Sequence, residues 1–221
     1  MKDKHSINFN EINSHEQYKI LAGSVVPRPI ALITTLNENN IVNAAPFSFF
    51  NALSANPPLV GFGIQKKLDG QPKDTYSNII NKKEFVVNLV SDDLVEAMNI
   101  CAIPFESDID ELVAAKLSKV DGSLISVPRI KEARISLECV LHDAIPTGER
   151  GDLLLGRIVM AHIDEHLVDS EKLYIDQVGL DAVGRMGGNG YVRSPEYFDL
   201  NSIQASDTPP YKQERKWHKE K

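Results

Sequence analysis

The sequence has few cysteines and no general excess of basic residues. Its 221 residues include two cysteines, Cys101 and Cys139, too few for a disulfide framework and without metal-ligand spacing. Both lie in apolar surroundings, so we expect buried free thiols. The net charge is −7, and basic residues are concentrated only near the C-terminus, which argues against a nucleic-acid surface. We therefore expect neither a metal site nor a nucleic-acid partner.

Long apolar runs are also missing. No stretch approaches the roughly 18 apolar residues of a membrane span, and residues 1–13 lack the apolar centre of a signal peptide. We therefore expect a cytoplasmic protein with no membrane partner. Hydrophobic residues make up 42% of the chain and charged residues 25%, which is typical of a globular protein with an adequate core.

We expect one domain over residues 1–201 and a polar tail over residues 202–221. The tail contains Pro209-Pro210 and one large aromatic residue, Trp217. A segment of this composition is either disordered or an arm laid on a partner subunit.

Strand patterns outnumber helical patterns in the domain. Apolar or alternating segments predict strands at residues 30–36, 41–44, 59–64, 84–90, 133–142 and 153–163, the last two as a hairpin. Helices are predicted from residue 74 or 75 to 82, from 91 to 102 and from 111 to 116, with a short helix or turn over residues 14–21. The strands form neighbouring pairs rather than βαβ units, which favours an antiparallel barrel with inserted helices.

Local patterns add three expectations. Asp74 or Thr75 should cap the helix that ends at Lys82, and residues 107–110 resemble a capping box for the helix at 111–116. Gly61 and Gly63 share one face of their strand and should admit a close neighbour. In the strand over residues 133–142, the face opposite the apolar one carries Arg134, Ser136, Glu138 and His142.

Residues 43–58 differ from a plain strand or a plain loop. The run Asn-Ala-Ala-Pro-Phe-Ser-Phe-Phe-Asn-Ala-Leu-Ser-Ala-Asn-Pro-Pro has prolines near both ends, and proline cannot donate to a β-ladder. A plain loop would not carry Phe47, Phe49 and Phe50. The segment indicates a rigid backbone that offers N–H groups and hydroxyls beside an aromatic surface, as a planar, phosphate-bearing cofactor requires. The alternative is a buried strand with an irregular start.

A second candidate for cofactor binding lies at residues 73–78. Lys73 precedes the predicted helix, and Thr75 and Asn78 are expected in its first turn. A phosphate group favours a cation, hydroxyls and unpaired N–H groups, and this helix start supplies all three. The alternatives are a solvated surface lysine at position 73 and a simple capping residue at position 75.

Other conspicuous residues carry no catalytic assignment. Residues 185–191, Arg-Met-Gly-Gly-Asn-Gly-Tyr, are glycine-rich but follow no clear strand and open no clear helix, so a dinucleotide fingerprint is the wrong interpretation. His142 and His162 flank the predicted hairpin, and an exposed or satisfied strand histidine is the better interpretation of each than a proton donor.

Several of these runs together resemble one family. They are residues 27–35 (Pro-Arg-Pro-Ile-Ala-Leu-Ile-Thr-Thr), 43–50, Ser54, Pro57-Pro58, 73–75, Asn78-Ile79 and 84–89 (Glu-Phe-Val-Val-Asn-Leu). Over roughly residues 15–200 their order and spacing resemble the flavin reductase-like, FMN-binding split-barrel family, which includes the flavoredoxins. The resemblance implies a mainly β fold with helical insertions, a six-stranded Greek-key split β-barrel. It also implies a homodimer with FMN bound noncovalently near the subunit interface.

The resemblance also implies roles for individual residues. Pro46, Phe47 and Ser48 would offer mainly backbone groups to the isoalloxazine and ribityl chain, and Ser54 with residues 73–75 would hold the phosphate. Arg28 would contact the phosphate or the pyrimidine, or else is a surface arginine. Tyr191 would stack on or cover the ring, or else caps the core. The expected cofactor-binding residues are Arg28, Ala45, Pro46, Phe47, Ser48, Phe49, Asn51, Ser54, Lys73, Asp74, Thr75, Asn78, Arg185 and Tyr191.

The implied function is an FMN-binding oxidoreductase. It would pass electrons from NADH or NADPH through FMN to a flavin, oxygen or a protein redox partner, and the cofactor would carry the chemistry. One alternative is an FMN-binding, flavoredoxin-like electron-transfer protein without its own nicotinamide site. Another is a split-barrel protein that binds haem or a different phosphate ligand instead of flavin.

Overall fold

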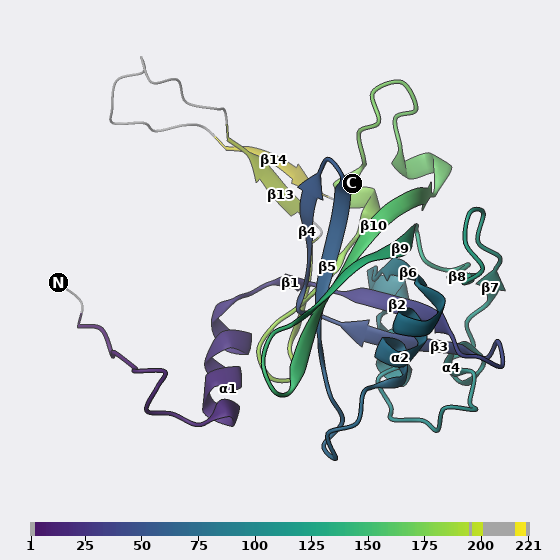
Figure 1. Ribbon diagram of the computed structural model, residues 1–221. Coiled ribbons are helices and arrows are strands. Elements are labelled where there is room, and N and C mark those ends of the chain that lie inside the picture. Colours follow the sequence, from purple (N-terminus) through teal and green to yellow (C-terminus); the bar gives the residue numbers. More distant parts are fainter. Residues whose placement is uncertain (1–2, 195, 201–214, 220–221) are drawn as a thin grey trace.

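A curled antiparallel sheet forms the centre of the molecule (Figure 1). The computed structural model describes residues 3–194, 196–200 and 215–219, so most of the predicted tail lies outside the described residues. The strand order is β3-β2-β6-β9-β10-β5-β4, and each neighbouring pair is antiparallel. The strands are β2 (Ala31–Leu36), β3 (Val42–Phe47), β4 (Phe50–Ala55), β5 (Pro58–Gln65), β6 (Glu84–Leu89), β9 (Ile135–Pro146) and β10 (Gly151–Ile163).

The chain connectivity makes this sheet curl into a barrel. β3 and β4 lie at opposite edges of the strand order, yet only Ser48 and Phe49 separate them in sequence. Two residues cannot cross a flat sheet of this width, because neighbouring strands lie about 4.8 Å apart. The two edges therefore approach each other at this connection, where the Phe49 carbonyl extends the pairing of β4 with β5 by accepting a hydrogen bond of 2.8 Å from the Gly63 amide. The result is a split β-barrel, and the prediction of a mainly β split barrel is confirmed.

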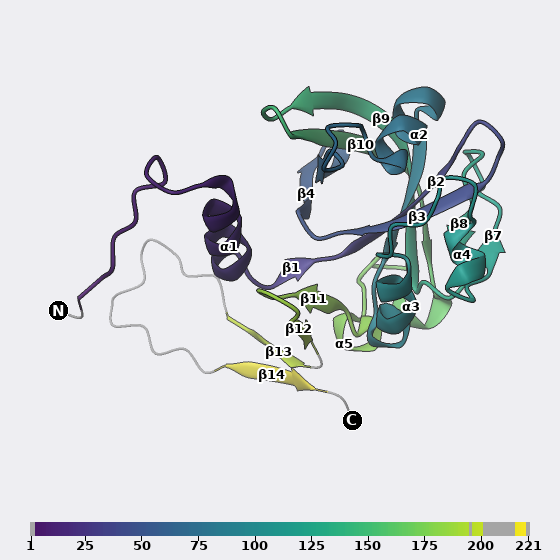
Figure 2. The same cartoon turned by 90° about the horizontal axis from the view of Figure 1, so that it is seen from below.

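Shorter elements surround the barrel. The small strands are β1 (Arg28–Pro29), β7 (Lys119–Val120), β8 (Arg129–Ile130), β11 (Val183–Arg185), β12 (Tyr191–Arg193), β13 (Glu196–Asp199) and β14 (Lys216–Lys219). The helices are α1 (Ser14–Ser24), α2 (Asp74–Lys82), α3 (Val95–Ile100), α4 (Glu111–Ala114) and α5 (Gln177–Leu180), with 3-10 turns at Asp92–Leu94 and Glu165–Leu167. Figure 2 shows α3, α4, β7 and β8 against one side of the barrel, whereas α1 stands apart beyond β1. No helix among the described residues is long and apolar enough to cross a membrane.

Three helices differ from the sequence prediction. The N-cap of α2 is Lys73, and no side chain caps it there, so the predicted capping by Asp74 or Thr75 is wrong. The helix expected over 91–102 is a 3-10 turn followed by the shorter α3. The cap of α4 is Asp110, whose carboxylate accepts two backbone N–H groups, and the helix ends early because Lys116 lies in the left-handed region at φ 57°.

Apolar side chains pack in two layers, one inside the barrel and one outside it. Inside, the rings of Phe47 and Phe62 lie 4.9 Å apart, and the rings of Phe62 and Phe85 lie 5.7 Å apart. The outer layer joins β2 and β6 to α3 and α4. Both cysteines are buried and free, as predicted, and burial raises the pKa of Cys101 to about 12.

The face of β9 that carries the polar residues Ser136 and Glu138 is covered by protein. Glu138 is fully buried. Its carboxylate accepts hydrogen bonds from the backbone amides of Ser123 and Leu124 and lies 2.7 Å from Nε2 of His162. Burial acts to raise the pKa of Glu138, but these hydrogen bonds outweigh it and the pKa is lowered. The loop over residues 120–128 therefore folds over this face. His162 is a satisfied strand histidine, because its ring nitrogen contacts Glu138.

Candidate functional site

Residues 43–58 form two strands rather than one irregular segment. The first is β3, an edge strand of the described sheet that pairs only with β2. Pro46 is tolerated there because an edge strand needs only one row of ladder hydrogen bonds. The second is β4, whose residues are almost all exposed. Gly61 admits a close neighbour from β4, as predicted, because a Cβ there would lie 2.5 Å from Cδ1 of Leu53, whereas a Cβ on Gly63 would make only an ordinary contact of 3.4 Å with Phe49.

The exposed aromatic surface of this segment belongs to Phe49. Phe47 is buried in the barrel, so only its backbone can face a ligand. Phe49 is 42% exposed, and its ring stacks on Tyr18 of α1 with centroids 6.2 Å apart. The guanidinium of Arg28 lies 5.7 Å from the Phe49 ring centroid. An aromatic face beside a cation therefore lies where β3 passes into β4.

The side chain of Arg28 is buried, so its interpretation as a surface arginine is wrong. Its guanidinium donates to the carbonyls of Ala22 and Val25 at 2.6 and 2.8 Å and to the Met186 carbonyl at 3.1 Å. Nε contacts Oγ of Ser48 at 3.4 Å. One side chain thereby joins the end of α1, the connection between β3 and β4, and the glycine-rich turn.

The glycine-rich run is the turn of a hairpin between β11 and β12. It does follow a short strand, but it opens another strand and no helix, so it has no dinucleotide fingerprint. Arg185 pairs with Arg28 across β1 and β11, and its guanidinium lies 4.5 Å from the Tyr191 ring centroid. Tyr191 is 38% exposed, so it does not cap the core.

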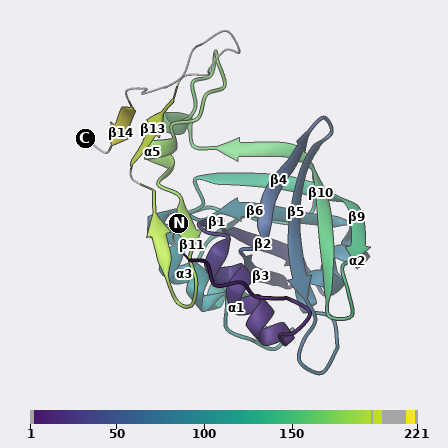
Figure 3. The same ribbon diagram turned by 90° about the vertical axis from the view of Figure 1, so that its left-hand side faces the viewer.

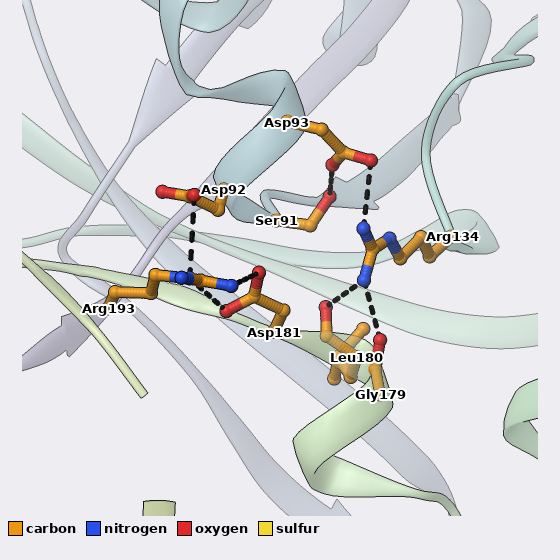
Figure 4. Close-up of polar contacts among 8 residues, drawn as sticks. All are labelled: Ser91, Asp92, Asp93, Arg134, Gly179, Leu180, Asp181 and Arg193. Carbon is orange, nitrogen blue, oxygen red and sulfur yellow. Dashed lines mark hydrogen bonds and ion pairs between the residues drawn. The ribbon is translucent and has the colours of Figure 1, made fainter. Parts of the chain in front are cut away.

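A polar cluster anchors this hairpin to the barrel (Figure 4). Arg193 of β12 makes two contacts of 2.7 Å with Asp181 and a contact of 3.4 Å with Asp92. Beside it, Arg134 contacts Asp93 at 2.9 Å. Burial acts to raise the pKa of Asp93, but hydrogen bonds from Ser91 and Arg134 lower it overall. The cluster fixes the hairpin that carries Arg185 and Tyr191.

The second predicted cluster lies beside the first. The ammonium of Lys73 is 5.9 Å from the Phe47 ring centroid, which places the start of α2 next to β3. Nδ2 of Asn43 on β3 donates to Oγ1 of Thr75 at 3.1 Å. The uncapped first turn of α2 leaves backbone N–H groups for an anion, with Lys73 as the adjacent cation.

Two predicted phosphate ligands serve mainly to fasten α2. Asn78 lies beyond the first turn, is buried and donates to Oγ1 of Thr35 on β2 at 3.0 Å. Asp74 pairs with Lys67 at 3.2 Å, so its carboxylate neutralises a neighbouring lysine. Only the backbone N–H of Asp74 suits a phosphate.

Ser54 is not brought to Lys73. It lies opposite Leu59 on β5, four residues beyond Phe50, or about 13 Å along an extended strand. Figure 1 shows the tip of β4 at the end of the sheet opposite the loop that leads into α2. Asn51 also lies on this exposed strand. Ala45, in contrast, pairs with Ile33 inside β3, beside the other lining residues.

Two residues at this site had no assigned role in the sequence. Tyr18 supplies the ring that stacks on Phe49. The only feature of the sequence that could have indicated this role is that Tyr18 is an aromatic residue in a mostly polar predicted helix. Glu111 is buried on α4 and accepts a hydrogen bond from the Ala44 amide. Its position just after an N-cap resembles an ordinary helix-start acid, so no local signal distinguishes it.

The fold is a split β-barrel. Its edge strand β3 lies next to the lysine-led start of α2 and leads into the exposed ring of Phe49. Residues 22–181 match the flavin reductase like domain family, and the chain belongs to that family.

Individual similar proteins extend the similarity over nearly the whole chain. Nitrilotriacetate monooxygenase component B from Bacillus cereus is 40% identical, with a TM-score of 0.87 over 90% of this chain and 100% of that one. The 2-nitrobenzoate 2-nitroreductase NbaA of Pseudomonas fluorescens is 33% identical, with a TM-score of 0.85 over 93% and 100%. An uncharacterized protein of Halalkalibacterium halodurans is 40% identical over 88% of this chain and 95% of its own length.

Proposed function

We propose that this protein binds FMN and acts as an NAD(P)H-dependent flavin reductase. The observation that carries the proposal is the position of Lys73, at an uncapped helix start and 5.9 Å from the ring of Phe47 on β3. A phosphate monoester needs this donor set, which combines a cation with free N–H groups. The similarity to a monooxygenase component and to a nitroreductase supports an oxidoreductase role.

The chain's own groups would bind and orient the cofactor. The backbone of residues 45–48 would face the ring and the ribityl chain, and the Phe49 and Tyr18 rings would supply apolar surface beside it. Lys73 and the N–H groups of the first turn of α2 would hold the phosphate. Bound FMN would supply the hydride and electron chemistry, and the glycine-rich turn beside Tyr191 would limit access of water.

We further propose a homodimer formed through α1 and β4. These elements lie on the same side of the molecule (Figure 3). Tyr18, Leu21, Phe49 and Leu53 are between 42% and 52% exposed, an apolar surface of the kind that marks an interface. The outer edge of β4 has no strand partner among the described residues, which also favours association. The ring end of the flavin site would then lie near the subunit interface.

The direct test is the visible spectrum of the purified protein, followed by anaerobic titration. Flavin absorbance in the isolated or FMN-reconstituted protein, bleached by NADH or NADPH, is the expected result. Bleaching by dithionite alone would instead indicate an electron-transfer protein without a nicotinamide site. Failure to bind added FMN would contradict the proposal.

A further inference from the structure

Glu111 is a buried acidic residue that satisfies the free edge of β3. It lies on α4, is 8% exposed and accepts a hydrogen bond from the backbone amide of Ala44. Pro46, two residues further along the same edge, has no N–H group. The Glu111 carboxyl therefore takes the place of a neighbouring strand at the point where β3 approaches the proposed flavin site.

The same stretch of β3 also contacts the proposed phosphate position. Asn43, the residue before Ala44, donates through Nδ2 to Oγ1 of Thr75 at 3.1 Å, and Thr75 is buried in the first turn of α2. Both α2 and α4 pack against β3 (Figure 1). Two consecutive residues of one strand thus connect the Glu111 carboxyl to the helix start that would hold the phosphate.

The titratable groups around Glu111 are mostly acidic. Asp110 precedes it at the N-cap of α4, and Asp74 opens α2. Sγ of Cys101, at the end of α3, lies 3.9 Å from the Glu111 carbonyl, and β3 has no titratable side chain. Each of the two aspartates is in turn paired with a lysine, Lys119 for Asp110 and Lys67 for Asp74.

We propose that Glu111 is a positioning residue for the flavin phosphate and that FMN binds most tightly when the Glu111 carboxyl carries a proton. In either protonation state an oxygen of this carboxyl accepts from Ala44 and holds β3 in place. The ionised group adds a negative charge near the phosphate, whereas the protonated group does not, and charges in buried surroundings are poorly screened. This inference rests on the proposed flavin function.

The sign of the pH dependence follows from the pKa of Glu111. Burial, with the charges of Asp74 and Asp110, raises this pKa to about 7. A bound phosphate should raise it further, so FMN binding near pH 7 should be accompanied by proton uptake at Glu111. Relative to a variant that is neutral at position 111, the wild type should lose FMN affinity as the pH rises through about 7.

Fluorescence titrations of FMN with the wild type and Glu111→Gln, between about pH 5.5 and about pH 8.5, test the inference. The ratio of the two affinities cancels the titration of the FMN phosphate itself. The affinities should agree within about twofold at the lower pH, and the variant should bind about three- to tenfold more tightly at the higher pH. Glu96→Gln removes an exposed charge on α3 and should match the wild type throughout.

A second variant tests the positioning role. Glu111→Ala removes the acceptor for the Ala44 amide together with the charge, so it should bind FMN roughly tenfold more weakly than Glu111→Gln at every pH. If Glu111→Ala does not fold, the comparison of the wild type with Glu111→Gln still decides.

The inference is overturned if the affinity ratio of Glu111→Gln to the wild type is the same at both ends of the pH range. It is also overturned if Glu111→Ala binds FMN as tightly as Glu111→Gln. If none of these proteins binds FMN at any pH, the proposed function itself fails, and that result is distinct from FMN binding with a constant ratio.

Discussion

The carboxylate of Glu111 on α4 accepts a hydrogen bond from the backbone amide of Ala44 on β3. This contact satisfies an N–H group on the free edge of the strand that passes Lys73 and continues into Phe49. Because β3 lines the proposed flavin site, the contact ties the position of that site to a buried acidic group. Its titration should be visible in the stability of the protein.

Stability should fall as the pH rises from about 4.5 to about 7. Burial, together with the negative charges of Asp74 and Asp110, raises the pKa of Glu111 from 4.5 to about 7, against the lowering effect of the Ala44 amide. Between these values the folded state binds more protons than the unfolded state, so the free energy of unfolding decreases with pH and levels off above about 7.

Glu111→Gln should remove this dependence, because the neutral amide still accepts from Ala44. At pH 8 the variant should be more stable than the wild type by at most about 3 kcal/mol, and at pH 5 the two should be similar. Urea denaturation of both proteins at several pH values measures the difference. A constant difference at every pH would contradict the assigned titration.

Lys73→Ala should weaken FMN binding by about 1.5–3 kcal/mol, or roughly 10- to 100-fold, because it removes a charged hydrogen bond to the phosphate. The wild-type affinity should also fall with rising salt concentration. Lys82→Ala, at the other end of the same helix, is the control for charge alone. Fluorescence titration measures the FMN affinity of the wild type and of both variants. An unchanged affinity in Lys73→Ala would remove Lys73 from the site.

Arg28→Ala should destabilise the fold by at least about 2 kcal/mol. It removes the donor to the buried carbonyl of Ala22 and to the partly buried carbonyls of Val25 and Met186, and unpaired buried acceptors are costly. Thermal or urea unfolding measures the loss, with Arg150→Ala in an exposed turn as the control. Normal stability combined with lost FMN affinity would instead identify Arg28 as a direct ligand.

Leu53→Asp should convert the proposed dimer to a monomer. Leu53 is 52% exposed on β4, and a charge at the centre of an apolar interface is left without compensation. Leu68→Asp is a matched control, because Leu68 is 97% exposed on the loop before α2. Sedimentation velocity distinguishes the two states. A wild-type monomer would refute the interface altogether.

Gly156→Ala should destabilise the barrel by about 1–3 kcal/mol through overpacking. A Cβ at this position would clash with Cζ of Phe85, whose ring is fully buried and cannot move aside freely. Gly23→Ala, where nothing lies within 4 Å of the new atom, should be neutral or slightly stabilising. Denaturant unfolding of the two variants gives the comparison.

Most of the strands and the lysine-led helix start were predictable because their signals are local. Residues 84–90 and 153–163 carry apolar patterns that match β6 and β10 closely. Lys73 was recognised as a candidate because it directly precedes a helix pattern. The burial of Glu138 on the polar face of β9 could not be predicted, since it depends on a loop that folds back from residues 120–128.

Local patterns in the sequence determined an antiparallel barrel with inserted helices and the two segments that supply the proposed site, because alternation, prolines and a helix start act over a few residues, and the family resemblance added the split-barrel class. Only the tertiary structure decided that β3 and β4 occupy opposite edges of one curled sheet and that Ser54 lies away from Lys73. It also decided that the Arg28 guanidinium donates to backbone carbonyls of the protein itself. Those outcomes depend on contacts between residues distant in the chain, and a linear pattern does not encode which distant partner a side chain will meet.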